Sequence, residues 1–139
     1  MQGLHITADC QGCDPSSALM NEPAALRRLC LDTVAACGLQ AVGELFHRFP
    51  APGGVTGVVL LAESHLAVHT WPEMAAVTLD VYVCNLGRDN SAMAEQLMQA
   101  LLAAFRPVEV QRNDLLRGLP VDAQFAGVIH AKGPRSVGS

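Results

Sequence analysis

The sequence has few aromatic residues, no excess of basic residues and no long apolar run. Aromatic residues make up 4% of its 139 residues, and the formal net charge is -4 at pH 7. Nucleic-acid binding usually uses a basic surface and aromatic stacking platforms, so we expect no nucleic-acid partner. No stretch approaches the roughly 20 apolar residues that cross a bilayer, and the N-terminus lacks the charged and apolar regions of a signal peptide. We therefore expect a cytoplasmic protein with no membrane partner.

The cysteines do not suggest a disulfide framework or a metal site. Their number is odd, and a chain without a secretion signal keeps its thiols reduced. Cys10 and Cys13 form a CxxC pair, but no second pair accompanies it, so no metal is predicted. The length suits one domain over residues 1–139, and we expect residues 130–139 to form a flexible tail.

The hydrophobic pattern predicts an α+β fold. Helical spacing predicts amphipathic helices over residues 21–37, with Asn21 as the cap, and over residues 91–105. Period-2 alternation predicts strands near residues 4–8, 39–49, 55–64, 65–71, 77–84 and 108–112. This order favours a two-layer sandwich, in which an antiparallel sheet carries both helices on one face. The other face is polar, and we expect a second copy of the chain to cover it at a dimer interface.

The stretch Glu63–Glu73, ESHLAVHTWPE, concentrates the chemistry of the chain. Ser64 could be a nucleophile with His65 or His69 as its base, but no G-x-S-x-G elbow surrounds it. The two histidines are four residues apart, which on a strand separates them by about 13 Å, too far for one metal ion. The glycine-rich GGVTG upstream lacks the lysine of a phosphate-binding loop, so we expect its glycines to allow sharp turns or close approach of another segment.

The stretch ESHLAVHTWPE resembles the self-cleaving centre of the bacterial and archaeal S-adenosylmethionine decarboxylases, which are pyruvoyl-dependent enzymes of spermidine synthesis. GVTGVVLLA precedes it and DVYVC follows it, as in that family. GCDP near the N-terminus and ELFHRF before the glycine-rich turn also fall in the family's order, so the resemblance covers residues 3–118.

The resemblance implies that the chain is a proenzyme that cuts itself between Glu63 and Ser64. The products would be fragments of residues 1–63 and 64–139, and Ser64 would become a pyruvoyl cofactor that forms a Schiff base with the substrate. His69 matches the proton acceptor of this processing, and Thr56 matches a hydroxyl residue that assists it.

Further matches concern the decarboxylation itself. Cys84 matches the family's proton donor, a role that suits a thiol, which is mostly protonated at neutral pH. Phe49, Trp71 and Glu73 match residues that bind the nucleoside part of S-adenosylmethionine. The resemblance also implies a homodimer of cleaved protomers, since the family builds its active sites between protomers.

The chain departs from the family where an aromatic-rich Tyr-Gly-Tyr often follows the glutamate, because Met74, Ala75 and Ala76 stand there. These departures concern the substrate more than self-processing. Two alternatives therefore stay open. One is the same pyruvoyl chemistry acting on another amino acid, such as ornithine or arginine. The other is an uncleaved, non-catalytic paralogue.

Overall fold

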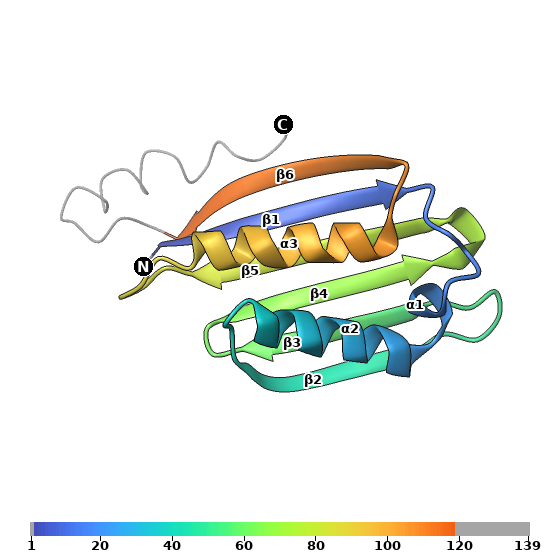
Figure 1. Cartoon of the computed structure of the whole chain (residues 1–139), viewed down its shortest axis with the longest axis horizontal. Coiled ribbons are helices and arrows are strands. Elements are labelled where there is room, and N and C mark those ends of the chain that lie inside the picture. The colour runs from blue at the N-terminus through green and yellow to red at the C-terminus, as the bar shows by residue number, and fades with distance from the viewer. Residues whose placement is uncertain (1, 119–139) are drawn as a thin grey trace, which may run out of the picture.

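A computed structural model describes residues 2–118, which form one antiparallel sheet with helices on one of its faces (Figure 1). The predicted tail at residues 130–139 lies outside this range. The strands are β1 (Gln2–Gln11), β2 (Ala41–Arg48), β3 (Val55–Leu61), β4 (Ser64–Trp71), β5 (Ala76–Cys84) and β6 (Glu109–Gly118). The helices are α1 (Ala18–Asn21), α2 (Pro23–Ala36) and α3 (Ser91–Phe105), with a 3-10 turn, η1 (Pro72–Met74).

The strand order across the sheet is β2-β3-β4-β5-β1-β6, and every neighbouring pair is antiparallel. Helices α2 and α3 lie side by side on the same face of this sheet (Figure 1). The predicted α+β two-layer architecture is therefore confirmed. Within residues 2–118 no helix covers the opposite face, which we call the open face.

The apolar face of the central strands packs against the helices because alternate side chains point to the same side of a strand. On β4, Leu66, Val68 and Thr70 are buried, and the intervening residues are only partly buried. Thr70 is the polar member of this set. Its hydroxyl donates to the carbonyl of Met20 and accepts from the N–H of Val55, at 2.8 Å each. The buried hydroxyl is thereby satisfied and ties α1 to the sheet.

The first predicted helix is correct in extent but wrong in its cap. Pro23 occupies the first turn of α2, and Gly38 follows its end with a φ of +83°. The N-cap is Glu22 instead of Asn21. Asn21 is instead the last residue of the four-residue helix α1, where its side-chain amide donates to the carbonyls of Pro15 and Ser17, and the backbone becomes extended only at Glu22. The second helix has the predicted bounds, Ser91–Phe105.

Two glycines of the hairpin allow the close approaches that the sequence suggested. A Cβ placed on Gly57 would lie 2.2 Å from the ring of Phe46 on the neighbouring strand. A Cβ placed on Gly54, whose φ is +119°, would lie 2.5 Å from the carbonyl oxygen of Thr70. The glycines therefore serve packing and backbone geometry: Gly54 directly precedes strand β3 and Gly57 lies within it.

The last strand was predicted too short. β6 runs from Glu109 to Gly118, whereas the sequence pattern gave a strand only over residues 108–112. Nearly all of its side chains are exposed, so the alternation of buried and exposed residues that marks the other strands is missing. Pairing with β1 over its full length forms the strand instead.

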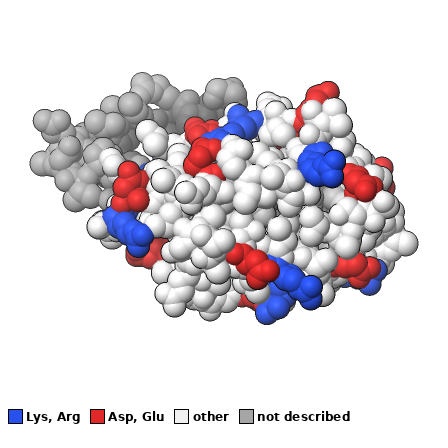
Figure 2. All heavy atoms as spheres, in the orientation of Figure 1, with Lys and Arg blue, Asp and Glu red and all other residues white. Residues whose placement is uncertain are grey.

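The helix-bearing side carries charges of both signs. Basic and acidic side chains adjoin one another around its rim, and its middle is uncharged (Figure 2). This side therefore presents no patch of a single sign. None of the described helices combines the length and hydropathy needed to cross a membrane.

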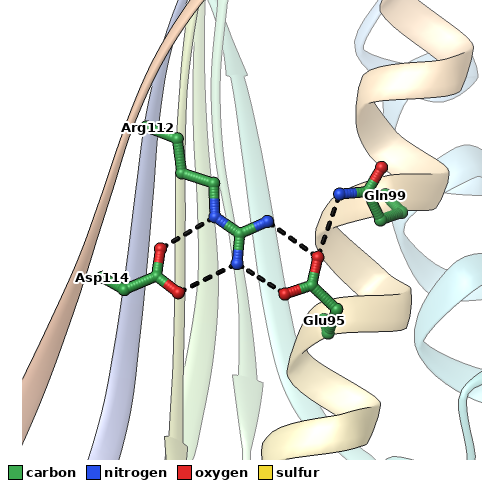
Figure 3. Close-up of polar contacts among 4 residues, drawn as sticks. All are labelled: Glu95, Gln99, Arg112 and Asp114. Atoms are coloured by element: carbon green, nitrogen blue, oxygen red, sulfur yellow. Dashed lines mark hydrogen bonds and ion pairs between the residues drawn. The ribbon is translucent and has the colours of Figure 1, made fainter.

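A network of charged side chains fastens helix α3 to edge strand β6 (Figure 3). The guanidinium of Arg112 donates to both oxygens of Glu95 at 2.5 and 2.7 Å, and to both oxygens of Asp114 at 2.8 and 3.0 Å. Gln99 donates to Glu95 at 2.9 Å. The hydrogen bonds from Arg112 lower the pKa of Asp114 and lower that of Glu95 from 4.5 to about 2. Folding therefore favours the ionised carboxylates.

We expect Arg112→Met to remove acid-sensitive stability. A carboxylate whose pKa is lowered by folding stabilises the protein above its unfolded pKa, and this stability is lost as the pH falls from about 4.5 to about 2. Because the side chains of Glu95 and Asp114 are 45% and 48% exposed, we expect a loss of about 1 kcal/mol at pH 7. The variant should also show a flatter decline toward pH 2 in urea unfolding.

Arg48→Met is the matched control, because Arg48 and Glu22 form a wider, more exposed pair at 3.7 Å. It should change the free energy of unfolding by less than about 0.5 kcal/mol. Equal effects of the two substitutions would contradict the role given to the Arg112 network.

Candidate active site

The predicted scissile bond, Glu63–Ser64, lies in the tight turn that joins β3 to β4. β3 ends at Leu61 and β4 begins at Ser64, which pairs with Leu61 across the turn. Glu63 is exposed and Ser64 is partly buried. The carbonyl of Glu63 and the hydroxyl of Ser64 are therefore adjacent groups in an accessible turn at one end of the sheet.

Ser64 and Cys84 meet at this end of the sheet, although 20 residues separate them. The backbone N–H of Cys84 donates to the Ser64 hydroxyl oxygen at 3.0 Å. Cys84 ends β5 and is 6% exposed. Both residues line a hollow of about 240 Å³, which Gly38, Glu63 and Met93 also border. The hollow lies at this end of the sheet, between the loop that follows α2 and the start of α3.

His69 lies on the open face, toward the other end of β4. Its Nδ1 is hydrogen-bonded to the hydroxyl of Thr56 at 3.0 Å, across the β3–β4 pair. The ring of His69 stacks on that of Trp71 with centroids 5.8 Å apart. The hydroxyl of Thr56 thus orients the imidazole of His69, and the tryptophan supports its outer face.

Phe49 and Glu73 lie beyond the same end of the sheet as Trp71. Phe49 follows β2, is 42% exposed and lines a surface hollow with Arg48 and the loop of residues 50–53. Its N–H donates to the carbonyl of Gly54 at 2.9 Å. Glu73 is exposed in η1. The three residues matched to nucleoside binding therefore occur together at this end.

The structure divides the predicted site residues into two groups. One, at the β3–β4 turn, is Glu63, Ser64 and Cys84; the other, toward the far end of β4, is Thr56, His69, Trp71, Phe49 and Glu73. Ser64 and Trp71 are the two ends of β4, which at a rise of about 3.3 Å per residue places their backbones about 23 Å apart. The same rise puts His69 about 16 Å from Ser64. Within one chain, His69 is too distant to reach the scissile bond.

The CxxC pair stays apart from both groups. Cys10 and Cys13 are free and buried, and burial raises the pKa of Cys13 and raises that of Cys10 to about 11. The N–H of Cys13 donates to the carbonyl of Ala75. The raised pKa values keep these thiols protonated at neutral pH.

Sequence reasoning missed a polar cluster on the central strands of the open face, toward the Ser64 end of β4, which we call the His-Asp cluster. It consists of His5 on β1, His65 on β4 and Asp80 on β5, with Tyr82 between the two histidines. The residues are up to 75 positions apart in sequence, so no local motif contains them. Only the register of the three strands brings them together.

The chain is thus a small α+β domain with two groups of candidate catalytic residues. A serine and a cysteine are in contact at one end of the sheet, and a threonine hydroxyl orients a histidine toward the other end. A family model described as S-adenosylmethionine decarboxylase matches residues 4–118. The chain belongs to the S-adenosylmethionine decarboxylase family. This result confirms the resemblance seen in ESHLAVHTWPE.

Relatives from distant prokaryotes match over most of the chain. The S-adenosylmethionine decarboxylase proenzyme of Hydrogenobaculum sp. (strain Y04AAS1) is 35% identical over 127 residues, which is 91% of this chain and 90% of that protein. The proenzyme of Pyrococcus furiosus is 33% identical over 117 residues, or 84% and 79% of the two chains. The crystal structure of adenosylmethionine decarboxylase from Aquifex aeolicus VF5 superposes with a TM-score of 0.77. It is 32% identical, and the match covers 86% of this chain and 93% of that one.

The structure explains one departure from the family pattern. Ala75, where the family often has glycine, has a φ of +51° and ends η1 in the left-handed conformation. Its N–H donates to the carbonyl of Pro72 at 3.0 Å. A side chain is strained in this conformation, which accounts for the glycine in the family's Tyr-Gly-Tyr.

We expect Ala75→Gly to stabilise the protein by about 0.5 to 1 kcal/mol, because it relieves the left-handed strain at some cost in unfolded-state entropy. The midpoint of urea unfolding measures the change. Ala100→Gly, in the exposed middle of α3, is the matched control and should destabilise by about 1 kcal/mol. A loss of stability at both positions would refute the strain at Ala75.

Proposed function

We propose that the chain is a self-processing S-adenosylmethionine decarboxylase whose pyruvoyl group comes from Ser64. The observation that carries this proposal is the contact between Ser64 and Cys84, two residues to which the family resemblance gives roles in one reaction. The contact lies beside a hollow open to a small substrate. The family membership supports the decarboxylation reaction, and the contact between Ser64 and Cys84 supports the roles proposed for these two residues.

Cleavage would begin with attack of the Ser64 hydroxyl on the carbonyl carbon of Glu63. The new C–O bond replaces the peptide C–N bond, and the freed amine of Ser64 takes up the proton, which leaves an ester. His69 then accepts the proton from the α-carbon of Ser64 while the bond between its β-carbon and the ester oxygen breaks, so that a carbon–carbon double bond forms and Glu63 leaves as a carboxylate. Water and loss of ammonia complete the conversion of the residue. Thr56 would position His69 for this step through the hydrogen bond at 3.0 Å.

The residues around Ser64 fit a pyruvoyl group. The N–H of Cys84 already donates to the side-chain oxygen of Ser64, and the same N–H can donate to a carbonyl oxygen at that position. When formed, the group supplies an electron-withdrawing carbonyl that condenses with the substrate's α-amino group and promotes loss of carbon dioxide. The thiol of Cys84 would then donate a proton to the substrate's α-carbon.

A homodimer would bring the two groups of site residues together. In each chain His69 is about 16 Å from Ser64, and both His69 and Trp71 lie on the open face. If two copies stack through their open faces about a twofold axis across β4, the Ser64 end of one chain lies against the His69 end of the other. Leu45 and Leu60, which are 69% and 50% exposed on the open face, would gain apolar cover.

In this arrangement the substrate would lie between protomers. Phe49 and Trp71 offer aromatic faces to the adenine and the sulfonium, and Glu73 can accept hydrogen bonds from ribose hydroxyls. Retention of these three residues favours S-adenosylmethionine over ornithine or arginine.

We expect the purified protein to consist of fragments 1–63 and 64–139, with the second lacking a free N-terminal amine. Ser64→Ala, which removes the nucleophile, should remain one intact chain. Intact-mass spectrometry measures both. A wild-type chain that is never cut would refute self-processing and would favour the non-catalytic alternative.

The dimer can be tested by co-expressing two chains with different tags, Ser64→Ala and His69→Ala. Alone, neither should form the pyruvoyl fragment. Together, the His69→Ala chain should be processed, because it keeps Ser64 and receives a histidine from its partner. Failure of processing in an isolated Ser64→Ala/His69→Ala complex would show that His69 does not act between chains. Arg28→Ala, which changes an exposed residue of helix α2 on the side of the sheet opposite His69, is the control and should process alone.

Substrate preference is tested by carbon dioxide release from S-adenosylmethionine, ornithine and arginine in parallel. We expect release from S-adenosylmethionine, and we expect Glu73→Gln to raise KM more than it lowers kcat, since it weakens ribose binding. A higher kcat/KM for ornithine or arginine would overturn the substrate assignment while leaving the processing chemistry intact.

A further inference from the structure

The His-Asp cluster has a ligand set that the proposed reaction does not use. His5, His65 and Asp80 lie on three adjacent central strands of the open face, toward the Ser64 end of β4, with side chains 14%, 36% and 38% exposed. His5 and His65 both stand opposite Tyr82 in the strand register, one on each side of it. Asp80 is two residues earlier on β5, so it is the diagonal neighbour of both histidines.

The three side chains converge through the atoms that bind metals. The Nε2 atoms of His5 and His65 both face Oδ1 of Asp80. His5 is hydrogen-bonded to this oxygen, and His65 lies 3.5 Å from it. All three ligand atoms lie within 4.8 Å of one another. In a tetrahedral zinc site with bonds of about 2.0 to 2.1 Å, ligand atoms are about 3.3 Å apart, so small side-chain rotations would complete the site.

We propose that His5, His65 and Asp80 form a binding site for a divalent transition metal of the zinc type. Two imidazoles and one carboxylate are a frequent protein ligand set for Zn²⁺, and the fourth position would face outward from the sheet. The ligands stand on central strands, which hold them more rigidly than loops do. His65 directly follows Ser64 in β4, so the site adjoins the Ser64–Cys84 contact, but its three ligands are not used in the proposed reaction.

Arg117 is the group that opposes metal binding. Its Nη1 donates to Nδ1 of His5 at 2.7 Å, which holds the His5 proton on Nε2. A histidine that binds a metal through Nε2 must carry its proton on Nδ1 and donate it to an acceptor. The metal therefore has to displace Arg117 from His5, and Arg117 lowers the metal affinity of the site.

The site is tested by stripping the full-length protein with a chelator and titrating it with Co²⁺ and Zn²⁺. We expect one ion per chain, a Co²⁺ absorption spectrum without thiolate charge-transfer bands, and a higher Tm with Zn²⁺. Asp80→Asn and His65→Ala should each weaken binding by at least about 100-fold, because loss of a ligand should cost no less than the 10 to 100-fold cost of losing an outer partner. His47→Ala is the matched histidine control and should leave the affinity unchanged.

Arg117→Gln tests whether the guanidinium opposes the metal at His5. Glutamine can accept the Nδ1 proton of His5, so we expect binding to become about 10-fold tighter. Circular dichroism of each variant without metal checks that the fold is retained. Binding that is absent at micromolar metal in a folded wild-type protein would overturn the proposal. So would binding that survives Asp80→Asn, or binding that is lost in Cys10→Ser, which would assign the metal to the CxxC pair.

Discussion

The geometry of strand β4 is the constraint on which the rest of the site depends. An extended strand advances about 3.3 Å per residue and alternates its side chains between two faces. The motif ESHLAVHTWPE therefore cannot form a compact site, however dense it is in sequence. Leu66 and Val68 anchor it in the core, while His65, His69 and Trp71 are spread along the open face.

Because the site residues are separated along β4, the open face is where a second chain could bring them together. Helices α2 and α3 cover one face of the sheet, but nothing within residues 2–118 covers the open face. A decarboxylase site that uses Ser64, Cys84 and His69 together needs a second strand running the opposite way. A twofold copy supplies one without any further element in the chain. The dimer is thus proposed because Ser64 and His69 lie too far apart on one sheet to act on the same bond.

Much of the fold could be predicted because its signals are local, such as the alternation in β4 and β5 and the helical spacing in α3. Strand β6 was predicted too short because its partner β1, instead of its own side-chain pattern, fixes its length. The same division holds in the site. Ser64 and His69 stand in one contiguous motif, whereas His5, His65 and Asp80 meet only when the strand register is known. Register is set by the packing of the whole sheet, so no short segment of the sequence predicts it.

The departures at Met74–Ala76 can now be placed in physical terms. Ala75 adopts a left-handed backbone that glycine would adopt more easily, at the end of the turn that carries Glu73. Met74 is 60% exposed beside this turn, where the family often has tyrosine. The change therefore concerns side chains close to Trp71 and Glu73, the residues proposed to bind the nucleoside. Ser64 and Cys84 lie at the other end of the sheet, so the substitutions bear on the fit of the substrate more than on the cleavage chemistry.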